Sequence, residues 1–473
     1  MKSSKVTLKD QIAFAELSGD YNSLHIDAVF ARRSLFGSLV VHGIYSVLWS
    51  LNNWLEDKTS HIELSSIRAV FPKPIRVDEE LSLSIVSEDE RQFRIELRTN
   101  GSVATIIDVE WVKSKRKDVN CLKIGFPDKR QSRHLSEDEI ESGSGTLALY
   151  LNVEAAARMF PNLIRCASPL QIAVILSTTR LVGAECPGIH SMYSALNLTA
   201  NDSHECTTTK YEVTKLDKRF NLVFMKITAP GMTGTIKAFV RPTHQEQVSY
   251  LQMKKLLKSS EFAGQHALIV GGSRGLGEVS AKLLAAGSAE VKITYHQGEE
   301  DAQRIVEEIN SNGGTADCLQ FDILSPEQNS LFRSLSDWSP THLYYFATPF
   351  IFSGVKGVFS PELFKKFCDY YITGFVKTLI PLRNSGLKNV FYPSTVAIDE
   401  MPEDMREYTA VKMAGETLCM FLRENYKDLT IYSPRLERLS TDQTVSLLPV
   451  NNQDPVPIML KHLRYLRDNS LSV

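Results

Sequence analysis

The apolar and polar positions of the first 112 residues predict one long helix and several strands. The helical pattern starts near Gly43 and runs through Trp54. Strand-like segments follow, and residues 81–85 and 93–97 alternate between apolar and polar side chains. The segments are 62–71, 81–87, 93–98 and 103–112. One helix followed by several antiparallel strands predicts an α+β domain in which a sheet wraps around the helix.

The same layout recurs after a polar segment. Residues 113–144 are rich in charged residues, serine and glycine, and they are predicted to form a linker or irregular loop. A helical pattern begins at Thr146 and includes the apolar stretch 169–182. Strand-like segments follow at 193–198, 208–213, 221–228 and 233–240. We expect residues 145–245 to form a second unit of the first type, with an unrelated α+β domain as the alternative.

The pattern changes again in the last part of the chain. Residues 246–263 predict a connecting segment with a short helix, from Tyr250 to Phe262. Strands and helices then alternate through residues 264–473, which predicts a doubly wound parallel sheet. The predicted strands are 267–270, 290–295, 316–321, 343–347, 389–393 and 429–433, and the predicted helices are 277–287, 299–312, 361–383 and 407–426.

Length and composition agree with several globular domains. A chain of 473 residues is long enough for about three domains. The net charge of −2 offers no basic excess for nucleic acid, and no apolar run is long enough to span a membrane. Seven scattered cysteines without a CxxC pair favour reduced thiols over disulfides or a zinc site. The N-terminus lacks the apolar core of a signal peptide. We therefore expect a cytoplasmic protein without a metal.

A glycine-rich turn and a Tyr–Lys pair suggest the chemistry of the last region. In HALIVGGSRGLGE, residues 266–278, Gly271, Gly275 and Gly277 follow the spacing GxxxGxG between a strand and a helix. Glycine permits a sharp turn and a close approach of the backbone to a phosphate, which the helix start attracts. Tyr408 and Lys412 lie four residues apart on a predicted helix and share one face.

Together the two motifs resemble the short-chain dehydrogenase/reductase family over residues 264–445. The resemblance implies a Rossmann fold in which Tyr408 donates a proton to the substrate carbonyl. Lys412 would lower the pKa of Tyr408 and hold the nicotinamide ribose. A serine-type hydroxyl would position the carbonyl; Ser394 has the usual residue type and Thr395 the usual spacing, so both remain candidates.

The charges near the predicted nucleotide site favour NADPH. No acidic residue ends the second strand, and Arg274 in the glycine turn could meet a 2′-phosphate. By the same resemblance, Asp322 would contact the adenine. The predicted cofactor-binding residues are Gly271, Ser273, Arg274, Gly275, Gly277, Tyr295, His296, Asp322 and Ala347.

Two departures from the family pattern leave turnover open. The family's NNAG is here Tyr345-Phe-Ala-Thr348, and the helix asparagine that often completes a catalytic tetrad is Tyr371. The domain could thus be a slow reductase, a specialised reductase, or a nucleotide-binding domain without turnover.

A polar stretch near the N-terminus carries a second set of candidate residues. Asp20, Asn22 and His25 stand in SGDxNxxHxD, which is followed by FGxxVVHG. Residues of these types are often only turn and capping residues. The full pattern resembles the MaoC-like dehydratases, or hydratase-2 family, over residues 5–112. That family has the hotdog fold, and with this resemblance we expect residues 145–245 to form a second, non-catalytic hotdog.

The resemblance implies a role for each of these residues. Asp20 and His25 would share the acid–base work of removing water across Cα–Cβ. A backbone N–H at Gly43 would hold the thioester oxygen, and Asn22 would orient the loop or His25. The family usually has proline where this chain has Ser23.

The two resemblances predict one multidomain chain, with an α+β double hotdog followed by an α/β Rossmann domain. We expect NADPH-dependent reduction of a 3-oxoacyl thioester and dehydration of the (R)-3-hydroxyacyl thioester to the trans-2-enoyl thioester, or the reverse hydration. The acyl group would be carried by acyl carrier protein or coenzyme A, and both families suggest a homo-oligomer. Three alternatives are a dehydratase with a degenerate reductase scaffold, a reductase with an acyl-binding hotdog half, and a carrier-binding module without activity.

Overall fold

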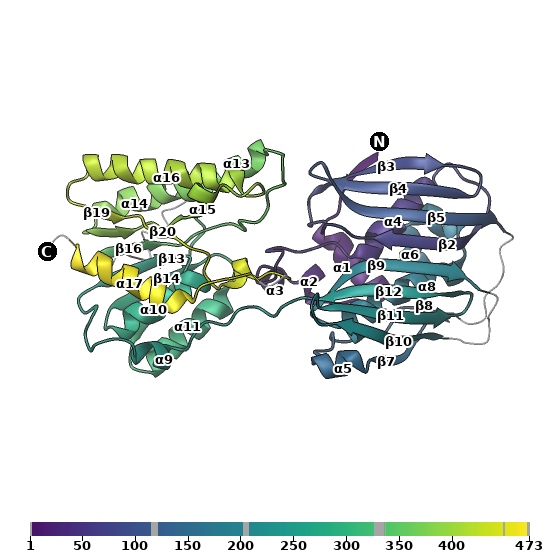
Figure 1. Ribbon diagram of the computed structural model, residues 1–473, viewed down its shortest axis with the longest axis horizontal. Helices are drawn as coiled ribbons and strands as arrows, with labels where there is room; N and C mark the ends of the chain where they lie inside the picture. The colour runs from purple at the N-terminus through teal and green to yellow at the C-terminus, as the bar shows by residue number, and fades with distance from the viewer. Residues whose placement is uncertain are drawn as a thin grey trace. The chain divides into compact units, whose positions relative to one another are not determined.

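The computed structural model describes residues 2–114, 122–201, 208–325, 335, 337–447 and 450–470. Residues 115–121 of the predicted linker, with Cys121, and also Cys206 lie outside the described residues. The chain divides into two compact units, Met1–Thr243 and His244–Val473 (Figure 1). Within the described residues, no helix combines the length and apolar character needed to cross a bilayer.

The first unit is built on one antiparallel sheet of ten strands, in the order β1-β3-β4-β5-β2-β9-β12-β11-β10-β7. The first half of the unit supplies β1 (Lys2–Lys5), β2 (Ile62–Val70), β3 (Glu80–Glu88), β4 (Gln92–Thr99) and β5 (Ser102–Lys113). The second half supplies β7 (Ser144–Ala148), β9 (Ser191–Ala200), β10 (Thr208–Asp217), β11 (Leu222–Ala229) and β12 (Met232–Val240). The halves join where β2 pairs with β9.

Each half adds one long helix, α4 (Gly43–Trp54) or α8 (Pro169–Arg180), and the two helices pack against each other. In the first half, the strands that follow α4 are ordered second, third, fourth, first; in the second half this order is mirrored about the β2–β9 junction. A single hydrophobic core includes residues of both halves, such as Leu51 and Ile172. Residues 145–240 thus repeat the layout of the first half.

Part of the predicted linker and the start of the second half differ from expectation. The linker contains β6 (Lys123–Ile124) and α5 (Glu137–Glu141). The helical pattern expected from Thr146 is wrong there, because β7 and β8 (Tyr150–Leu151) precede the helices α6 (Val153–Met159) and α7 (Pro161–Cys166). Five residues are too few to show a periodicity, and β7 is defined by its pairing with the distant β10.

The second unit has a parallel sheet of six strands, in the order β15-β14-β13-β16-β17-β19. The strands are β13 (His266–Val270), β14 (Glu290–Tyr295), β15 (Thr315–Gln320), β16 (His342–Tyr345), β17 (Asn389–Phe391) and β19 (Thr430–Tyr432). One face packs against α10 (Gly275–Ala286), α11 (Glu299–Ser311) and α17 (Pro455–Asp468). The other packs against α13 (Pro361–Cys368), α14 (Phe375–Arg383) and α16 (Arg406–Asn425), which confirms the doubly wound α/β arrangement (Figure 1).

Three helical segments of this unit differ from the predicted pattern. The helix expected over 361–383 is interrupted by a π-helical segment, η2 (Asp369–Gly374). The connecting helix α9 (Tyr250–Lys254) is shorter than predicted, and α17 was not predicted. Single-turn π segments leave the apolar spacing almost unchanged, so a sequence pattern does not reveal them.

Candidate active sites

The polar stretch of the first unit forms a tight turn followed by a short helix, and is not an irregular loop. Helix α1 (Leu8–Ser18) ends at Gly19, whose φ of 78° is left-handed and suits glycine. The chain then buries Asp20, which is 2% exposed. Asn22 caps the short helix α2 (Ser23–Ile26) by accepting a hydrogen bond from the N–H of Leu24, and α2 carries His25.

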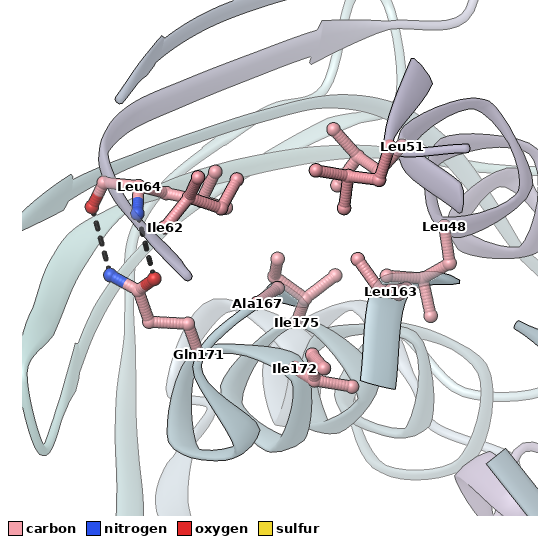
Figure 2. Close-up of a pocket in the computed structure, with 10 residues that line it drawn as sticks. Leu48, Leu51, Ile62, Leu64, Leu163, Ala167, Gln171, Ile172 and Ile175 are labelled. Atoms are coloured by element: carbon pink, nitrogen blue, oxygen red, sulfur yellow. Dashed lines mark hydrogen bonds between the residues drawn. The ribbon is translucent and has the colours of Figure 1, made fainter. Parts of the chain in front are cut away.

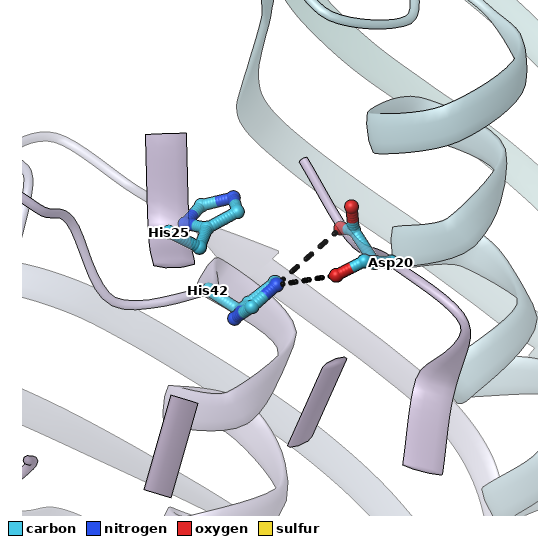
Figure 3. A group of neighbouring side chains, drawn as sticks. All are labelled: Asp20, His25 and His42. Carbon is cyan, nitrogen blue, oxygen red and sulfur yellow. Dashed lines mark hydrogen bonds and ion pairs between the residues drawn. The ribbon is translucent and has the colours of Figure 1, made fainter. Parts of the chain in front are cut away.

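The structure brings Asp20 and His25 together and adds His42, which the sequence did not single out (Figure 3). One polar atom of each of the three side chains lies within 4.8 Å of the others. The two imidazole rings stack with centroids 3.8 Å apart. His42 Nε2 lies 3.0 Å from the backbone oxygen of Asp20 and 3.9 Å from its Oδ2. His42 is the histidine of the VVHG segment, a signal that was available in the sequence.

Burial shifts the pKa values of the aspartate and of the two histidines in this cluster in opposite directions. It raises the pKa of Asp20 from its usual 3.8 to about 6, and hydrogen bonds from Thr179 and Asn22 act against this rise. Burial lowers the pKa of His25 to about 4 and that of His42 well below its usual value. His25 Nδ1 lies 2.6 Å from the carbonyl oxygen of Val40, which can only accept, so Nδ1 carries the proton and Nε2 is a free base.

The second half of the unit also contributes to this site. Thr179, in the last turn of α8, donates a hydrogen bond of 2.6 Å to Asp20 Oδ2. The side-chain amide of Asn22 donates to the carbonyl oxygens of Gly183, Gly188 and Ile189, each at 3.2 Å. These contacts link residues more than 150 positions apart, so no local motif could have revealed them.

Gly43 begins α4 beside this cluster. The residue before it, His42, occupies the N-cap position but makes no side-chain hydrogen bond to the first turn. A Cβ at position 43 would lie 3.1 Å from a ring carbon of Phe71, so glycine also suits the packing. The first N–H groups of α4 therefore remain available to an oxygen atom, and the helix dipole favours negative charge there.

A small apolar cavity of ≈ 10 Å³ lies between α4 and α8 (Figure 2). Gln171 closes one side by exchanging two hydrogen bonds of 2.8 Å with the backbone of Leu64. This volume holds about one water molecule. An acyl chain would enter only if the lining side chains moved. The lining residues are Leu48, Leu51, Leu55, Ile62, Leu64, Leu163, Ala167, Gln171, Ile172 and Ile175.

In the second unit, the glycine turn connects β13 to α10 as predicted. Gly271 (φ 84°) and Gly275 (φ 57°) have left-handed backbones. A Cβ on Gly271 would lie 2.9 Å from the backbone nitrogen of Ala347, and one on Gly277 would lie 2.2 Å from the oxygen of Gly271. Arg274 caps α10 without a side-chain hydrogen bond to its first turn. The N–H groups of Gly271 and Gly272 donate to Thr294, whereas the first turn of α10 has no side-chain cap and can offer its N–H groups to a phosphate.

The other predicted nucleotide-binding residues lie near the same edge of the sheet. His296 and Asp322 follow β14 and β15, and His296 Nδ1 lies 3.7 Å from Asp322 Oδ1. Tyr295 ends β14, and a hydrogen bond with Glu299 contributes to raising its pKa, after burial and the charge of Glu299. Ser273 is buried within the turn.

Arg274 has an acidic neighbour that the sequence did not indicate. Its guanidinium lies 3.8 Å from Asp442 Oδ2. Asp442 is 4% exposed and accepts a hydrogen bond from the backbone N–H of Gln245. A 2′-phosphate at Arg274 would therefore approach a carboxylate as well as a guanidinium.

Tyr408 and Lys412 lie on one face of α16 and are both buried. Burial raises the pKa of Tyr408 to about 12, and a hydrogen bond with Thr395 acts in the opposite direction. Ser394 points elsewhere, because its hydroxyl donates a 2.5 Å hydrogen bond to Glu416 Oε1. Of the two candidate hydroxyls, the geometry thus favours Thr395 as the neighbour of Tyr408.

Tyr371 occupies the space beside Lys412. The Lys412 Nζ atom lies 4.0 Å from the centre of the Tyr371 ring and donates a 2.7 Å hydrogen bond to the carbonyl oxygen of Pro393. The Tyr371 hydroxyl forms a short hydrogen bond with Thr348. Burial lowers the pKa of Lys412 to about 7. Tyr371 lies in η2, so the π-helical segment coincides with this candidate site.

Family models match both regions. The model described as "MaoC like domain" matches residues 1–108, and the model described as "short chain dehydrogenase" matches residues 265–334. The chain combines a MaoC-like domain at its N-terminus with a short-chain dehydrogenase domain in its C-terminal half.

The curated proteins that are similar to this chain match it over short stretches. The versicolorin reductase stcU of Emericella nidulans is 38% identical over 82 residues, which is 17% of this chain and 30% of that protein. A probable tetrahydroxynaphthalene reductase of Zymoseptoria tritici is 40% identical over 65 residues, or 14% of this chain and 24% of that protein. The chain thus spans under a third of the length of these relatives.

Solved structures also match the second region. One is a short chain dehydrogenase from Burkholderia cenocepacia in complex with NADP; it is 20% identical, with a TM-score of 0.39. Another is the angucycline C-6 ketoreductase LanV with bound NADP, also 20% identical, with a TM-score of 0.40. Each alignment covers 44% of this chain and 91% of the other chain.

Proposed function

We propose that the protein is a bifunctional enzyme of acyl thioesters. Its second unit would reduce a 3-oxoacyl thioester with NADPH, and its first would dehydrate the resulting (R)-3-hydroxyacyl thioester to the trans-2-enoyl thioester, or catalyse the reverse hydration. The observation that carries the proposal is the pair of buried Asp20 and partly buried His25 beside the open start of α4. The two reactions are consecutive, so their combination in one chain is chemically coherent.

In the dehydration, His25 is the base and Asp20 the acid. Nε2 of neutral His25 removes the Cα proton, and protonated Asp20 delivers a proton to the leaving hydroxyl. The pKa values of about 4 for His25 and about 6 for Asp20 allow both forms to coexist between these values. The N–H of Gly43 holds the thioester oxygen as negative charge develops on it. Asn22 keeps His25 in place by capping α2.

The second unit fits a nicotinamide dinucleotide. A pyrophosphate would bind at the first turn of α10, which has no side-chain cap, and Arg274 would supply a positive charge for a 2′-phosphate. When bound, NADPH supplies the hydride. Tyr408 would protonate the carbonyl oxygen, Thr395 would orient that oxygen, and Lys412 would hold the ribose and favour proton release from Tyr408.

The remaining features of the proposal concern the fold and the partners. The mirrored strand order of the first unit supports a double hotdog with one catalytic half. Acyl carrier protein or coenzyme A would present the substrate, and the protein would form a homo-oligomer. The names of the curated relatives, a versicolorin reductase and a probable tetrahydroxynaphthalene reductase, also suggest a hydroxynaphthalene-like compound as a reductase substrate.

One observation favours a second candidate function, a dehydratase whose second unit binds a nucleotide without turnover. Tyr371 replaces the expected asparagine, and the Lys412 Nζ atom contacts the Tyr371 ring and the carbonyl oxygen of Pro393. In that case the second unit would bind NADPH, but no 3-oxoacyl thioester would cause its oxidation.

One assay separates the two functions. The purified chain is mixed with NADPH and a short 3-oxoacyl thioester, and products are followed by mass spectrometry. The bifunctional proposal predicts the enoyl product; Tyr408→Phe should stop at the ketone and Asp20→Asn at the hydroxyl. If NADPH is not consumed but a supplied (R)-3-hydroxyacyl thioester is dehydrated, the second candidate function is correct.

A further inference from the structure

The last turn of α8 reaches into the acid–base site of the other half. Thr179 Oγ1 lies 2.6 Å from Asp20 Oδ2, with the hydroxyl donating. Both side chains are almost completely buried, at 3% and 2% exposure. A donor this close to a carboxylate away from solvent fixes the orientation of that carboxylate.

The backbone that follows α8 is shaped around the same carboxylate. The π-helical segment η1 (Leu181–Glu185) places Gly183 against Asp20, where a Cβ would lie 2.0 Å from Oδ1. No side chain other than hydrogen therefore fits at position 183 without a shift. The carbonyl oxygen of Gly183 also accepts a hydrogen bond from Asn22, so the same glycine contacts two residues of the predicted acid–base loop.

We propose that the second half of the first unit is a functional part of the acid–base site, and that Thr179 is its positioning residue. By donating to Oδ2, Thr179 would orient the Asp20 carboxyl group toward the substrate and determine the pH at which this group changes charge. The proposal deepens the dehydratase function proposed above and rests on it. It gives the half that lacks the SGDxNxxH motif a direct role in the reaction.

The charged and titratable neighbours of Asp20 leave a clear role for Thr179. His42, at the start of α4, and His25, on α2, both face Asp20, and burial keeps the pKa of each below its usual value. The Arg180 side chain lies next to Gly19. Its guanidinium donates to the carbonyl oxygen of Ala148 and contacts the ring of Tyr150. Arg241 influences His25 and donates to backbone oxygens of Ser191 and Ile189. At neutral pH both histidines are uncharged, so the hydroxyl of Thr179 is the strongest neutral donor to the carboxylate.

The test compares Thr179→Val with Thr179→Ser. Valine has nearly the shape of threonine but cannot donate, so the ionised form of Asp20 loses stabilisation and its titration should move up by about one pH unit. The alkaline limb of the dehydration profile should move with it, and kcat/KM at the optimum should fall about tenfold. Thr179→Ser keeps the hydroxyl and should restore both properties.

A matched control and a direct titration make the result decisive. Ser177 is another buried hydroxyl on α8, which bonds to the Val174 oxygen and Thr209, so Ser177→Ala removes a hydroxyl without touching Asp20. Carboxyl ¹³C NMR of aspartate-labelled protein, assigned with Asp20→Asn, reports the titration without substrate. If valine does not fold at position 179, Thr179→Ala removes the same donor.

The outcomes separate the inference from the function on which it rests. The inference is overturned if Asp20 titrates at the same pH in Thr179→Val as in the wild type, or if Ser177→Ala causes the same shift. If the titration moves as expected but the wild type neither dehydrates nor hydrates any thioester, the positioning of Asp20 stands and the proposed dehydratase function fails.

Discussion

In both candidate sites, burial raises the pKa of the acid and lowers that of the base, but by different amounts. In the first unit, burial raises the pKa of Asp20 to about 6 and lowers that of His25 to about 4, which reverses their usual order and leaves them about two units apart. In the second unit it raises the pKa of Tyr408 to about 12 and lowers that of Lys412 to about 7. Tyrosine is ordinarily slightly more acidic than lysine, so burial reverses this order and leaves the two pKa values about five units apart.

This difference indicates which of the two sites has its acid and base prepared for reaction before a ligand binds. Asp20 has donors from Thr179 and from the Asn22 backbone, and His25 has the Val40 carbonyl oxygen. Among the residues that the structure describes, Thr395 is the polar side chain whose hydrogen bond lowers the pKa of Tyr408. A tyrosine and a lysine buried in this way need further charge from a bound ligand before proton transfer becomes favourable. We therefore expect the first site to be preformed and the second to depend on its cofactor.

The largest effect should come from the acid–base pair. Asp20→Asn or His25→Ala removes a proton-transfer group, so dehydration should fall by roughly 10³-fold or more. Reduction by the second unit should be unchanged in the same samples. If NADPH oxidation fell in parallel, the two sites would not be independent of each other.

Tyr408→Phe should lower reduction by roughly 10³-fold, because it removes the proton donor to the carbonyl. Dehydration of a supplied (R)-3-hydroxyacyl thioester should keep its wild-type rate, which serves as the internal control. Full NADPH oxidation by this variant would show that another group protonates the carbonyl.

Stability should depend on pH with opposite sign in the two units. The folded pKa of Asp20 is raised, so its contribution to stability is present below about 3.8 and is lost as the pH rises through about 6. The folded pKa of Lys412 is lowered, so its contribution is present above about 10.5 and is lost as the pH falls through about 7. The upper limits are about 3 kcal/mol for Asp20 and about 5 kcal/mol for Lys412, and relaxation of the buried groups lowers both.

Denaturant unfolding at several pH values measures how the free energy of unfolding changes with pH in each of these two ranges. Asp20→Asn should flatten the change between pH 4 and 6, and Lys412→Met the change between pH 7 and 10. An unchanged profile in either variant would mean that its pKa in the folded state is close to the ordinary value.

Tyr371→Asn sharpens the comparison by restoring the residue type that the family resemblance leads one to expect. The smaller amide leaves space for water beside Lys412, which would hydrate the ammonium and raise its pKa. We expect reduction to become roughly tenfold faster near pH 7, with its acid–base profile moved to higher pH. Tyr371→Phe keeps the ring over Lys412 and is the matched control. A slower Tyr371→Asn variant would indicate that the tyrosine itself serves this site.

The smallest effect concerns the choice of nucleotide. Asp442→Asn removes the carboxylate 3.8 Å from Arg274 but keeps an oxygen for the Gln245 N–H. NADPH should bind about fivefold more tightly, because one partly buried charge pair is worth about 1 kcal/mol, and the gain should shrink at high salt. NADH, which lacks the 2′-phosphate, should bind as before; an equal gain for both nucleotides would exclude Arg274 as the phosphate ligand.

Much of the fold could be predicted from the sequence because many helices and strands are long and regular. The predicted bounds of α4 and β14 equal those of the structure, since twelve and six residues show the helical and strand patterns clearly. The errors fall on short or irregular elements, namely β7, the break at η2 and the length of α9. In each of these, a partner elsewhere in the fold or a local change of helix type determines the backbone.

The candidate sites divide in the same way. Asp20, Asn22, His25 and the glycine turn lie in compact motifs, so the sequence by itself determined them. Only the tertiary structure brought Thr179 to Asp20 across 159 positions and placed Asp442 beside Arg274. It also favoured Thr395 over the adjacent Ser394, because neighbouring residues of a strand point in opposite directions and only packing decides which faces Tyr408. A sequence records which groups are present, whereas their distances and burial, which determine their pKa values, arise from packing.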